Sequence, residues 1–287
     1  MPGIQKEIPA VTPLTVDSPT DDGPLAALRD GFLRYASAFI ANGETKDPAP
    51  YTLKRDHSLR VCGLSIRLGR SLDLEGSDML VAGAIGLLHD IGRFDQYRHY
   101  QTFSDHRSVD HGGLAAKIVR LSNAPGLLPP HARPWIDAAI YHHNKFALPD
   151  SLTGESLLFT RLIRDADKID IIGIVARDLQ GKMPMPAGID PTDPAAGDMP
   201  SEGILSALSA GSTADYRLAC TATDHLLLRL GWVYDLNFRE SFRILVRRGY
   251  LDALVDAVPK TSGVEPVIRN IRRHVVAALG GRGMAPD

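Results

Sequence analysis

The residues best suited to chemistry in this chain are His89 and Asp90, which stand side by side at the end of an apolar run. An imidazole and a carboxylate can together bind one divalent cation. Adjacent side chains point in different directions in the middle of an α-helix, but they can face one ligand at a helix end. Gly92 follows two residues later and favours such an end. The pair therefore predicts one part of a metal site whose other ligands come from elsewhere in the chain.

Further histidines and an aspartate lie on apolar faces of predicted helices and are candidate partners for this pair. In chain order they are His57, His111, His142, His143 and Asp167. His57, for example, recurs with Val61 and Leu64 at four- and three-residue steps, so its side chain is expected to point toward the core. A single histidine on an apolar face is more often a packed core residue than a ligand. The metal prediction therefore rests on the whole set.

The histidine doublet leaves a choice of ligand. His143 follows Ile140 by three residues and His142 follows Ala139 by the same step, so each can reach the inner side of its helix. We expect His143 to be the ligand and keep His142 as a further candidate. The alternative for the doublet is a helix end with His142 exposed.

Helical periodicity also distinguishes Asp165 from Asp167. Asp167 has Ile163 four residues before it and Ile171 four residues after it, which predicts that its carboxylate lies on the apolar side. Asp165 neighbours charged residues such as Lys168 and is expected on a solvated, ion-paired face.

Two cations that follow these motifs are candidates for binding an anionic substrate. Arg93 directly follows Gly92, and Lys145 stands two residues after the histidine doublet. Charge that develops on a phosphate group is stabilised by such side chains. We expect Arg93 to bind substrate and to take part in catalysis together with Asp90, and Lys145 to be a second substrate-binding residue. The alternative for each cation is a solvated surface charge.

The elements that must position these residues are predicted to be helices throughout, and the fold class is an all-α bundle. Residues 1–23 are rich in Pro, Thr, Asp and Ser and predict a flexible leader. A helical core over 24–178 follows, in which residues 94–107 are expected to form a polar loop. Residues 179–213 predict a flexible insertion, and 214–280 a C-terminal helical extension packed on the core.

Composition narrows the classes of function. With 44% hydrophobic and 23% charged residues and a formal charge of −2, the chain has no electrostatic footprint for duplex nucleic acid or an anionic membrane. Cys62 and Cys220 lie within amphipathic patterns, so no disulfide framework is implied. The first residues lack the basic start and unbroken apolar core of a signal peptide, and no run approaches the ~18 apolar residues that a membrane span needs. We expect a cytoplasmic protein.

The order of the candidate ligands resembles that of the HD-domain superfamily of metal-dependent phosphohydrolases. The resemblance covers roughly residues 56–174 and rests on His57, then His89-Asp90, then the late Asp167 in an Ala-Asp context. It implies an all-α bundle in which these four residues bind metal. It also implies that His111 and the histidine doublet are extra ligands, as in the HD-GYP phosphodiesterase branch. That branch usually has lysine where Arg93 stands here, and its Gly-Tyr-Pro segment is absent, which argues against a cyclic dinucleotide substrate.

The mixed nitrogen and oxygen ligands suit one or two ions of Mn, Fe, Co, Ni or Zn, and the absence of cysteine argues against a closed structural zinc site. With two ions, Asp90 is placed to bridge them. The resemblance implies hydrolysis of a phosphomonoester or phosphodiester in a small phosphorylated metabolite or nucleotide. Two alternatives stay open: a di-iron oxygenase of the same superfamily and a non-catalytic nucleotide-binding module. The segment 232–238 resembles the C-terminal extension of bacterial HD proteins, and its aromatic residues are expected to support a homodimer contact.

Overall fold

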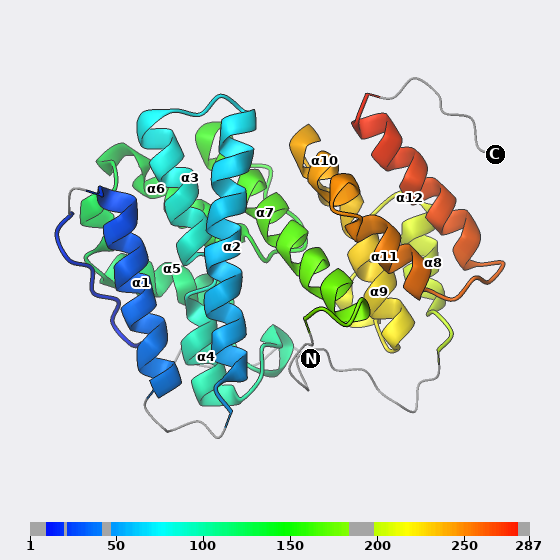
Figure 1. Cartoon of the computed structure of the whole chain (residues 1–287), viewed down its shortest axis with the longest axis horizontal. Coiled ribbons are helices and arrows are strands. Elements are labelled where there is room, and N and C mark those ends of the chain that lie inside the picture. Colours follow the sequence, from blue (N-terminus) through cyan, green and yellow to red (C-terminus); the bar gives the residue numbers. More distant parts are fainter. Residues whose placement is uncertain (1–9, 20–21, 42–46, 184–197, 281–287) are drawn as a thin grey trace. The chain divides into compact units, whose positions relative to one another are not determined.

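The computed structural model describes residues 10–19, 22–41, 47–183 and 198–280. Within these residues the regular structure is helical and no β-strand occurs, so the predicted all-α fold class is confirmed (Figure 1). The chain divides into two compact units, residues 1–167 and 168–287. Each unit is described by itself below.

The first unit is a helical bundle. Its helices are α1 (Pro24–Ala41), α2 (Ala49–Ser71), α3 (Gly76–Leu88), α4 (Gly92–Tyr100), α5 (His111–Leu121), α6 (Arg133–His142) and the first part of α7 (Gly154–Leu179), with short 3-10 turns at Asp105–Arg107, Ala124–Leu127 and Pro130–Ala132. Helices α2 and α3 lie side by side in the middle of the bundle (Figure 1). They approach closely at Gly86, where a Cβ atom would lie 2.5 Å from Oγ of Ser65. This packing sets the end of α3, which carries His89 and Asp90, against α2.

The turn after α3 leads directly into another helix. Residues 94–100 were expected to be part of a polar loop, but they belong to α4. Phe94 is fully buried in an aromatic cluster with Phe32, Tyr35 and Tyr51. The pattern did not predict this helix because its other buried side chains, such as Gln96, are polar and owe their burial to hydrogen bonds.

Part of the predicted flexible leader lies against the bundle. Leu14 and Val16 are buried, and the backbone N–H and hydroxyl of Thr12 donate to the buried carboxylate of Asp95 at 2.7 and 2.8 Å. The side chain of Asn123 pairs with the backbone N–H and carbonyl of Val16. Residues 10–19 therefore differ from the expectation because their backbone has fixed partners. Residues 1–9 and 20–21 of the predicted leader lie outside the described residues.

The second unit contains the last part of α7, one helix within the predicted insertion and the helices of the predicted C-terminal extension. These are α8 (Glu202–Ser209), α9 (Ala222–Gly231), α10 (Arg239–Arg247), α11 (Tyr250–Ala257) and α12 (Val264–Ala278), with 3-10 turns at Tyr216–Leu218 and Trp232–Asp235. Helix α8 lies inside the predicted flexible insertion, and Ile204 and Leu208 are fully buried. Residues 184–197 of that insertion lie outside the described residues. The packing of the extension on the core, and the homodimer, stay predictions.

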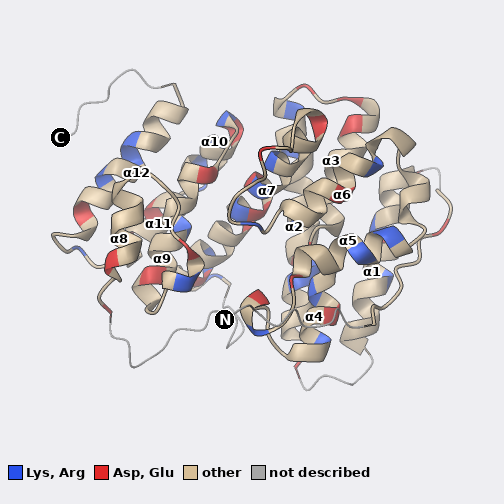
Figure 2. Cartoon of the chain, turned by 180° about the vertical axis from the view of Figure 1, so that it is seen from behind, with Lys and Arg blue, Asp and Glu red and all other residues tan. Residues whose placement is uncertain are grey.

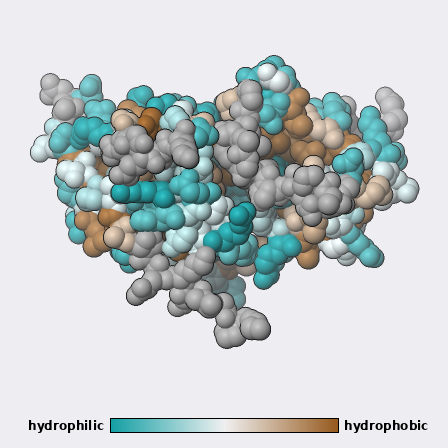
Figure 3. All heavy atoms as spheres, turned by 90° about the horizontal axis from the view of Figure 1, so that it is seen from below, coloured by the Kyte–Doolittle hydropathy of each residue, from teal (hydrophilic) through white to brown (hydrophobic). Residues whose placement is uncertain are grey.

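Charged residues of both signs are interspersed over the helices, in keeping with the small net charge (Figure 2). On the face seen in Figure 3, hydrophobic residues form separate patches among hydrophilic ones. Among the described helices, none combines the length and the apolar composition that crossing a bilayer requires.

Candidate metal centre

The predicted ligands come from helices that are far apart in the sequence, and all lie in the first unit. His57 stands on α2, His89 and Asp90 at the end of α3, His111 at the start of α5, His143 at the end of α6 and Asp167 on α7. The imidazoles and Asp90 are buried, with 0 to 3% of each residue exposed. Burying polar groups together is costly unless they are paired or share a ligand.

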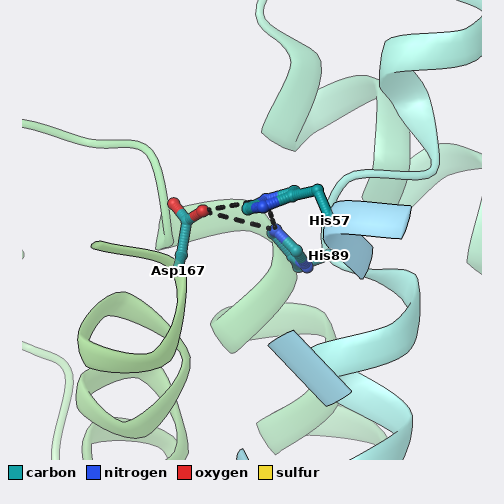
Figure 4. A group of neighbouring side chains, drawn as sticks. All are labelled: His57, His89 and Asp167. Carbon is teal, nitrogen blue, oxygen red and sulfur yellow. Dashed lines mark hydrogen bonds and ion pairs between the residues drawn. The ribbon is translucent and has the colours of Figure 1, made fainter. Parts of the chain in front are cut away.

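The first group of donors is His57, His89 and Asp167, whose side chains point toward one another (Figure 4). Nε2 of His57 lies 3.1 Å from Oδ1 of Asp167 and 3.3 Å from Nε2 of His89. Nε2 of His89 lies 3.7 Å from the same aspartate oxygen. Three donor atoms from α2, α7 and the end of α3 thus meet at one place.

The second group of donors is His111 and His143, whose Nε2 atoms lie 3.0 Å apart. Nδ1 of His111 lies 2.7 Å from the carboxylate of Asp105, and Nδ1 of His143 lies 2.7 Å from the carbonyl oxygen of Ile140. Ionised carboxylates and carbonyls only accept hydrogen bonds, so each Nδ1 carries a proton, and a lone pair is left on Nε2 wherever the ring is neutral. Two lone pairs that face each other repel unless a cation or a proton lies between them. A metal ion at this position fits the arrangement.

Asp90 lies between the two groups and offers one oxygen to each. Its Oδ2 is 3.6 Å from Nε2 of His57 and 3.9 Å from that of His89. Its Oδ1 is 3.3 Å from Nε2 of His111 and 3.7 Å from that of His143. The carboxylate therefore faces donors on both sides, as a ligand shared by two ions would.

The charge state of these carboxylates suits metal binding. Burial by itself raises the pKa of Asp90, but the charges of Lys54, Arg93 and His89 hold that pKa well below its usual range. Burial likewise raises the pKa of Asp167, and hydrogen bonds from His57 and His89 bring it well below the usual range. Both side chains are therefore carboxylates at neutral pH.

The imidazole of His143 is held in its neutral form. Burial lowers its pKa to about 4, with the nearby His111 and His89 rings adding to this effect against the Asp90 hydrogen bond. Nδ1 of His89 in turn lies 2.9 Å from the carbonyl oxygen of Gly86, which fixes its ring with Nε2 inward. Such a bond to the outer ring nitrogen is typical of metal-binding histidines, because it fixes the tautomer and the orientation.

Asp105 contacts the second donor group, and the sequence pattern did not reveal this contact. It accepts hydrogen bonds from His111, from the side-chain amides of Gln96 (2.8 Å) and Asn144 (3.0 Å) and from Arg93 (3.2 Å). Burial raises its pKa, but His111 and Arg93 outweigh burial and keep it far below its usual range. Asp105 lies on a 3-10 turn without apolar periodicity, and its only signal was its presence in a polar segment close to His111.

The cations around Asp90 include one predicted residue and one that was missed. Nε of Arg93 lies 3.3 Å from Oδ1 of Asp90, so the structure places this residue beside the donors. Nζ of Lys54 donates to Oδ2 at 2.8 Å. Lys54 precedes His57 by three residues, so shared helical facing with a ligand was the available signal.

Lys145 and His142 lie apart from the two donor groups. Nζ of Lys145 is ion-paired with Asp110, which caps α5, and lies 4.8 Å from the ring centroid of Tyr141. His142 is part of none of the metal-compatible groups in the described residues, and its buried Nδ1 has no hydrogen-bond partner there. Burial, Lys145 and Arg164 lower its pKa. Only one residue of the doublet faces inward because neighbours on a helix point about 100° apart.

The expected exposure of Asp165 is wrong. This residue is fully buried, and so are Leu162, Ile163 and Ala166 around it. Helix α7 is covered on several sides here, so a charged neighbour in the sequence does not indicate solvent. The carboxylate of Asp167, by contrast, points toward His57 and His89 in the first donor group.

Comparison with known proteins identifies the segment that carries this site. Residues 55–172 match the family model described as HD domain, a range that includes every ligand candidate from His57 to Asp167. No curated protein matches the chain, and no solved structure does so either.

Proposed function

Because the chain belongs to the HD-domain superfamily through residues 55–172, we propose that it is a metal-dependent phosphohydrolase acting on a small phosphorylated metabolite or nucleotide. The superfamily consists mostly of metal-dependent hydrolases. The observation that carries the proposal is the meeting of two donor groups on the two oxygens of Asp90. A packed helical core needs no such arrangement, because imidazoles and carboxylates that face one another in a buried space are costly unless a proton or a cation lies between them.

The proposed site holds two divalent transition-metal ions. His57, His89 and Asp167 would hold one ion, His111 and His143 would hold the other, and Asp90 would contribute to both. When bound, such ions supply Lewis acidity toward a phosphate group and toward water. Mn, Fe, Co, Ni and Zn all accept mixed imidazole and carboxylate ligands. His142 is the least supported ligand candidate, since its ring is not directed at either group.

The chain's own residues contribute charge and orientation. Asp105 and the carbonyls of Gly86 and Ile140 hold the histidine rings with Nε2 inward. Arg93 lies beside Asp90 and is proposed to bind the phosphate group and to stabilise the charge that develops during hydrolysis. Lys145, which lies apart from both donor groups, is proposed as a further contact to the substrate.

The test combines metal analysis with an activity screen. Protein purified without chelator or nickel affinity resin should contain about two ions per chain and release phosphate from members of a panel of phosphomonoesters and phosphodiesters. His57→Ala and His111→Ala should each remove an ion and most of the activity. The two-metal proposal is wrong if His111→Ala and His143→Ala each leave one ion per chain with activity intact.

The same nitrogen-rich set, with four imidazoles against two carboxylates, also suits a di-iron oxygenase. Phosphate release under argon supports the hydrolase, whereas oxygen uptake by a mixed-valent di-iron protein supports the oxygenase. Cations beside Asp90 favour the hydrolase, because a phosphate substrate needs them. A metal-free purified chain that binds nucleotide would instead point to a non-catalytic binding module.

A further inference from the structure

Lys54 is a cation inside the site, and it has no role in the proposed hydrolysis. It lies on α2, one helical turn before His57, and its Nζ donates to Oδ2 of Asp90 at 2.8 Å. The other oxygen of the same carboxylate accepts from Nε of Arg93 at 3.3 Å. Asp90 therefore holds one cation on each oxygen, in addition to facing both donor groups.

The two cations share one wall of the site. The ring centroid of Phe103 lies 5.2 Å from Nζ of Lys54 and 5.7 Å from Cζ of Arg93. The Lys54 and Arg93 side chains are 13% and 14% exposed, whereas that of Asp90 is only 4% exposed. A dissolved anion can therefore reach these cations more readily than the carboxylate of Asp90 behind them.

A metal ion held by the donor groups changes the balance of charge around Lys54. An ammonium group and a divalent cation that face one carboxylate repel each other, and burial strengthens this repulsion. Lys54 then needs a further anion, and its N–H donors suit phosphate oxygens. Arg93 differs because its guanidinium also donates to Gln96 and Asp105, which keep it in place.

We propose that Lys54 is a substrate-binding residue and forms, with Arg93, a clamp of two cations for a dianionic phosphate group. This inference rests on the proposed phosphohydrolase function and narrows it. A phosphomonoester carries about −1.5 to −2 charge at pH 7, whereas a phosphodiester carries a single negative charge. Two adjacent cations favour the dianion, so the substrate class is a phosphomonoester.

The experiment measures binding of inorganic phosphate and of dimethyl phosphate to the full chain loaded with Mn²⁺, by calorimetry, with metal content measured in parallel. Lys54→Met removes the charge and keeps an unbranched side chain. Arg55→Met is the matched control, because it removes the next cation on α2, one that pairs with Asp56 at 2.8 Å. Lys54→Arg restores a cation.

The unaltered chain should bind phosphate about tenfold or more tightly than dimethyl phosphate. Lys54→Met should weaken phosphate binding by about tenfold or more at unchanged metal content, as expected for loss of a charge-assisted hydrogen bond. Arg55→Met should stay within about twofold, and Lys54→Arg should recover part of the affinity.

Each other outcome overturns the inference in a distinct way. If Lys54→Met binds phosphate as tightly as the unaltered chain, Lys54 is not a substrate ligand, while the phosphohydrolase proposal stands. If Lys54→Met loses its metal, the lysine supports the donor groups and does not bind substrate. If the unaltered, metal-loaded chain binds neither anion, the inference and the proposed function fail together.

Discussion

The two donor groups share one feature, a histidine at a helix end whose ring is held by a backbone carbonyl (His89 and His143), but their other ligands are positioned by different means. In the first group, His57 and Asp167 stand inside the long helices α2 and α7, so the packing of those helices sets the place of each side chain. In the second group, His111 begins α5 and His143 follows the last residue of α6. Their rings are oriented by hydrogen bonds to Asp105 and to a backbone carbonyl.

The comparison shows that one site can combine a part set by apolar packing with a part set by a polar network. The first part should tolerate loss of a single polar contact, because whole helices hold it. The second should respond strongly, because Asp105 joins His111 to Arg93, Gln96 and Asn144. Substitutions that act on one group and spare the other can test this difference.

The largest effect is expected from Asp90→Asn, which acts where the two groups meet. The amide keeps the shape of the side chain but removes the charge that both groups and two cations face. Metal content should fall to near zero, and phosphate release should fall by roughly 10³-fold or more, as for loss of a central charge in an active site. Asp56→Asn, on the partly exposed ion pair with Arg55, should change neither quantity. Retention of one tightly bound ion by Asp90→Asn would show that one group binds metal without the shared carboxylate.

A smaller and more selective effect is expected from Asp105→Asn. The neutral amide oxygen of asparagine accepts the hydrogen bond from Nδ1 of His111 more weakly than the carboxylate does. The ring of His111 is then held less firmly, so the second ion should bind about 10- to 100-fold more weakly while the first remains bound. Metal titration followed by mass spectrometry of the intact protein resolves the two ions. Equal weakening of both ions would contradict the division into two independently positioned groups.

Asp224→Asn is a matched control for that experiment. Asp224 is also a buried carboxylate with several donors: it accepts from Ser201, Cys220 and Thr221 at the start of α9, in the second unit. Its loss should lower the free energy of unfolding by about 1 to 3 kcal/mol and leave metal content unchanged. The pair of variants separates loss of a hydrogen-bonded carboxylate from loss of a ligand's support.

The two donor groups also differ in how far the sequence could predict them. The helical repeat of His57 with Val61 and Leu64 predicted its inward direction, and the repeat around Asp167 did the same, because apolar periodicity reports the buried side of a helix. The helical fold class and the whole first group followed from such patterns together with the family resemblance.

The parts that could not be predicted depend on polar contacts between distant segments. Asp105 lies on a 3-10 turn, where no apolar repeat indicates its bond to His111. A helical repeat can place Lys54 on the same side of α2 as His57, but it carries no information on its partner Asp90, 36 positions away. The prediction for Asp165 was wrong for a related reason: where a helix is buried on several sides, no polar face distinguishes exposed positions from buried ones. Helix α4 was missed because several of its buried residues are polar.

A further prediction concerns the contact between the start of α4 and the first turn of α5, where His111 of the second donor group stands. A Cβ atom added at Gly92 would lie 2.6 Å from the carbonyl oxygen of His111 and 2.7 Å from the backbone nitrogen of Ala115. Gly92→Ala should therefore push the helices apart and lower the free energy of unfolding by about 1 to 3 kcal/mol, with the second ion weakened and the first retained. Chemical denaturation of the metal-free chain measures the stability, and Gly126→Ala, with nothing within 4 Å of the new atom, is the control. An unchanged second ion would mean that α5 can shift without moving His111.

The smallest effect is expected from Lys145→Met. Nζ of Lys145 pairs with Asp110, whose carboxylate also accepts hydrogen bonds from Gly112 and Asn144. The side chain of Lys145 is more exposed than that of Lys54. If Lys145 contacts the substrate, KM should rise about two- to fivefold with kcat unchanged, the range of a partly screened charge. The metal content decides the origin of any effect, because Asp110 caps the helix that begins with His111. A rise in KM with both ions retained indicates contact with substrate, whereas loss of the second ion would show that Lys145 acts through the polar network that supports the second donor group.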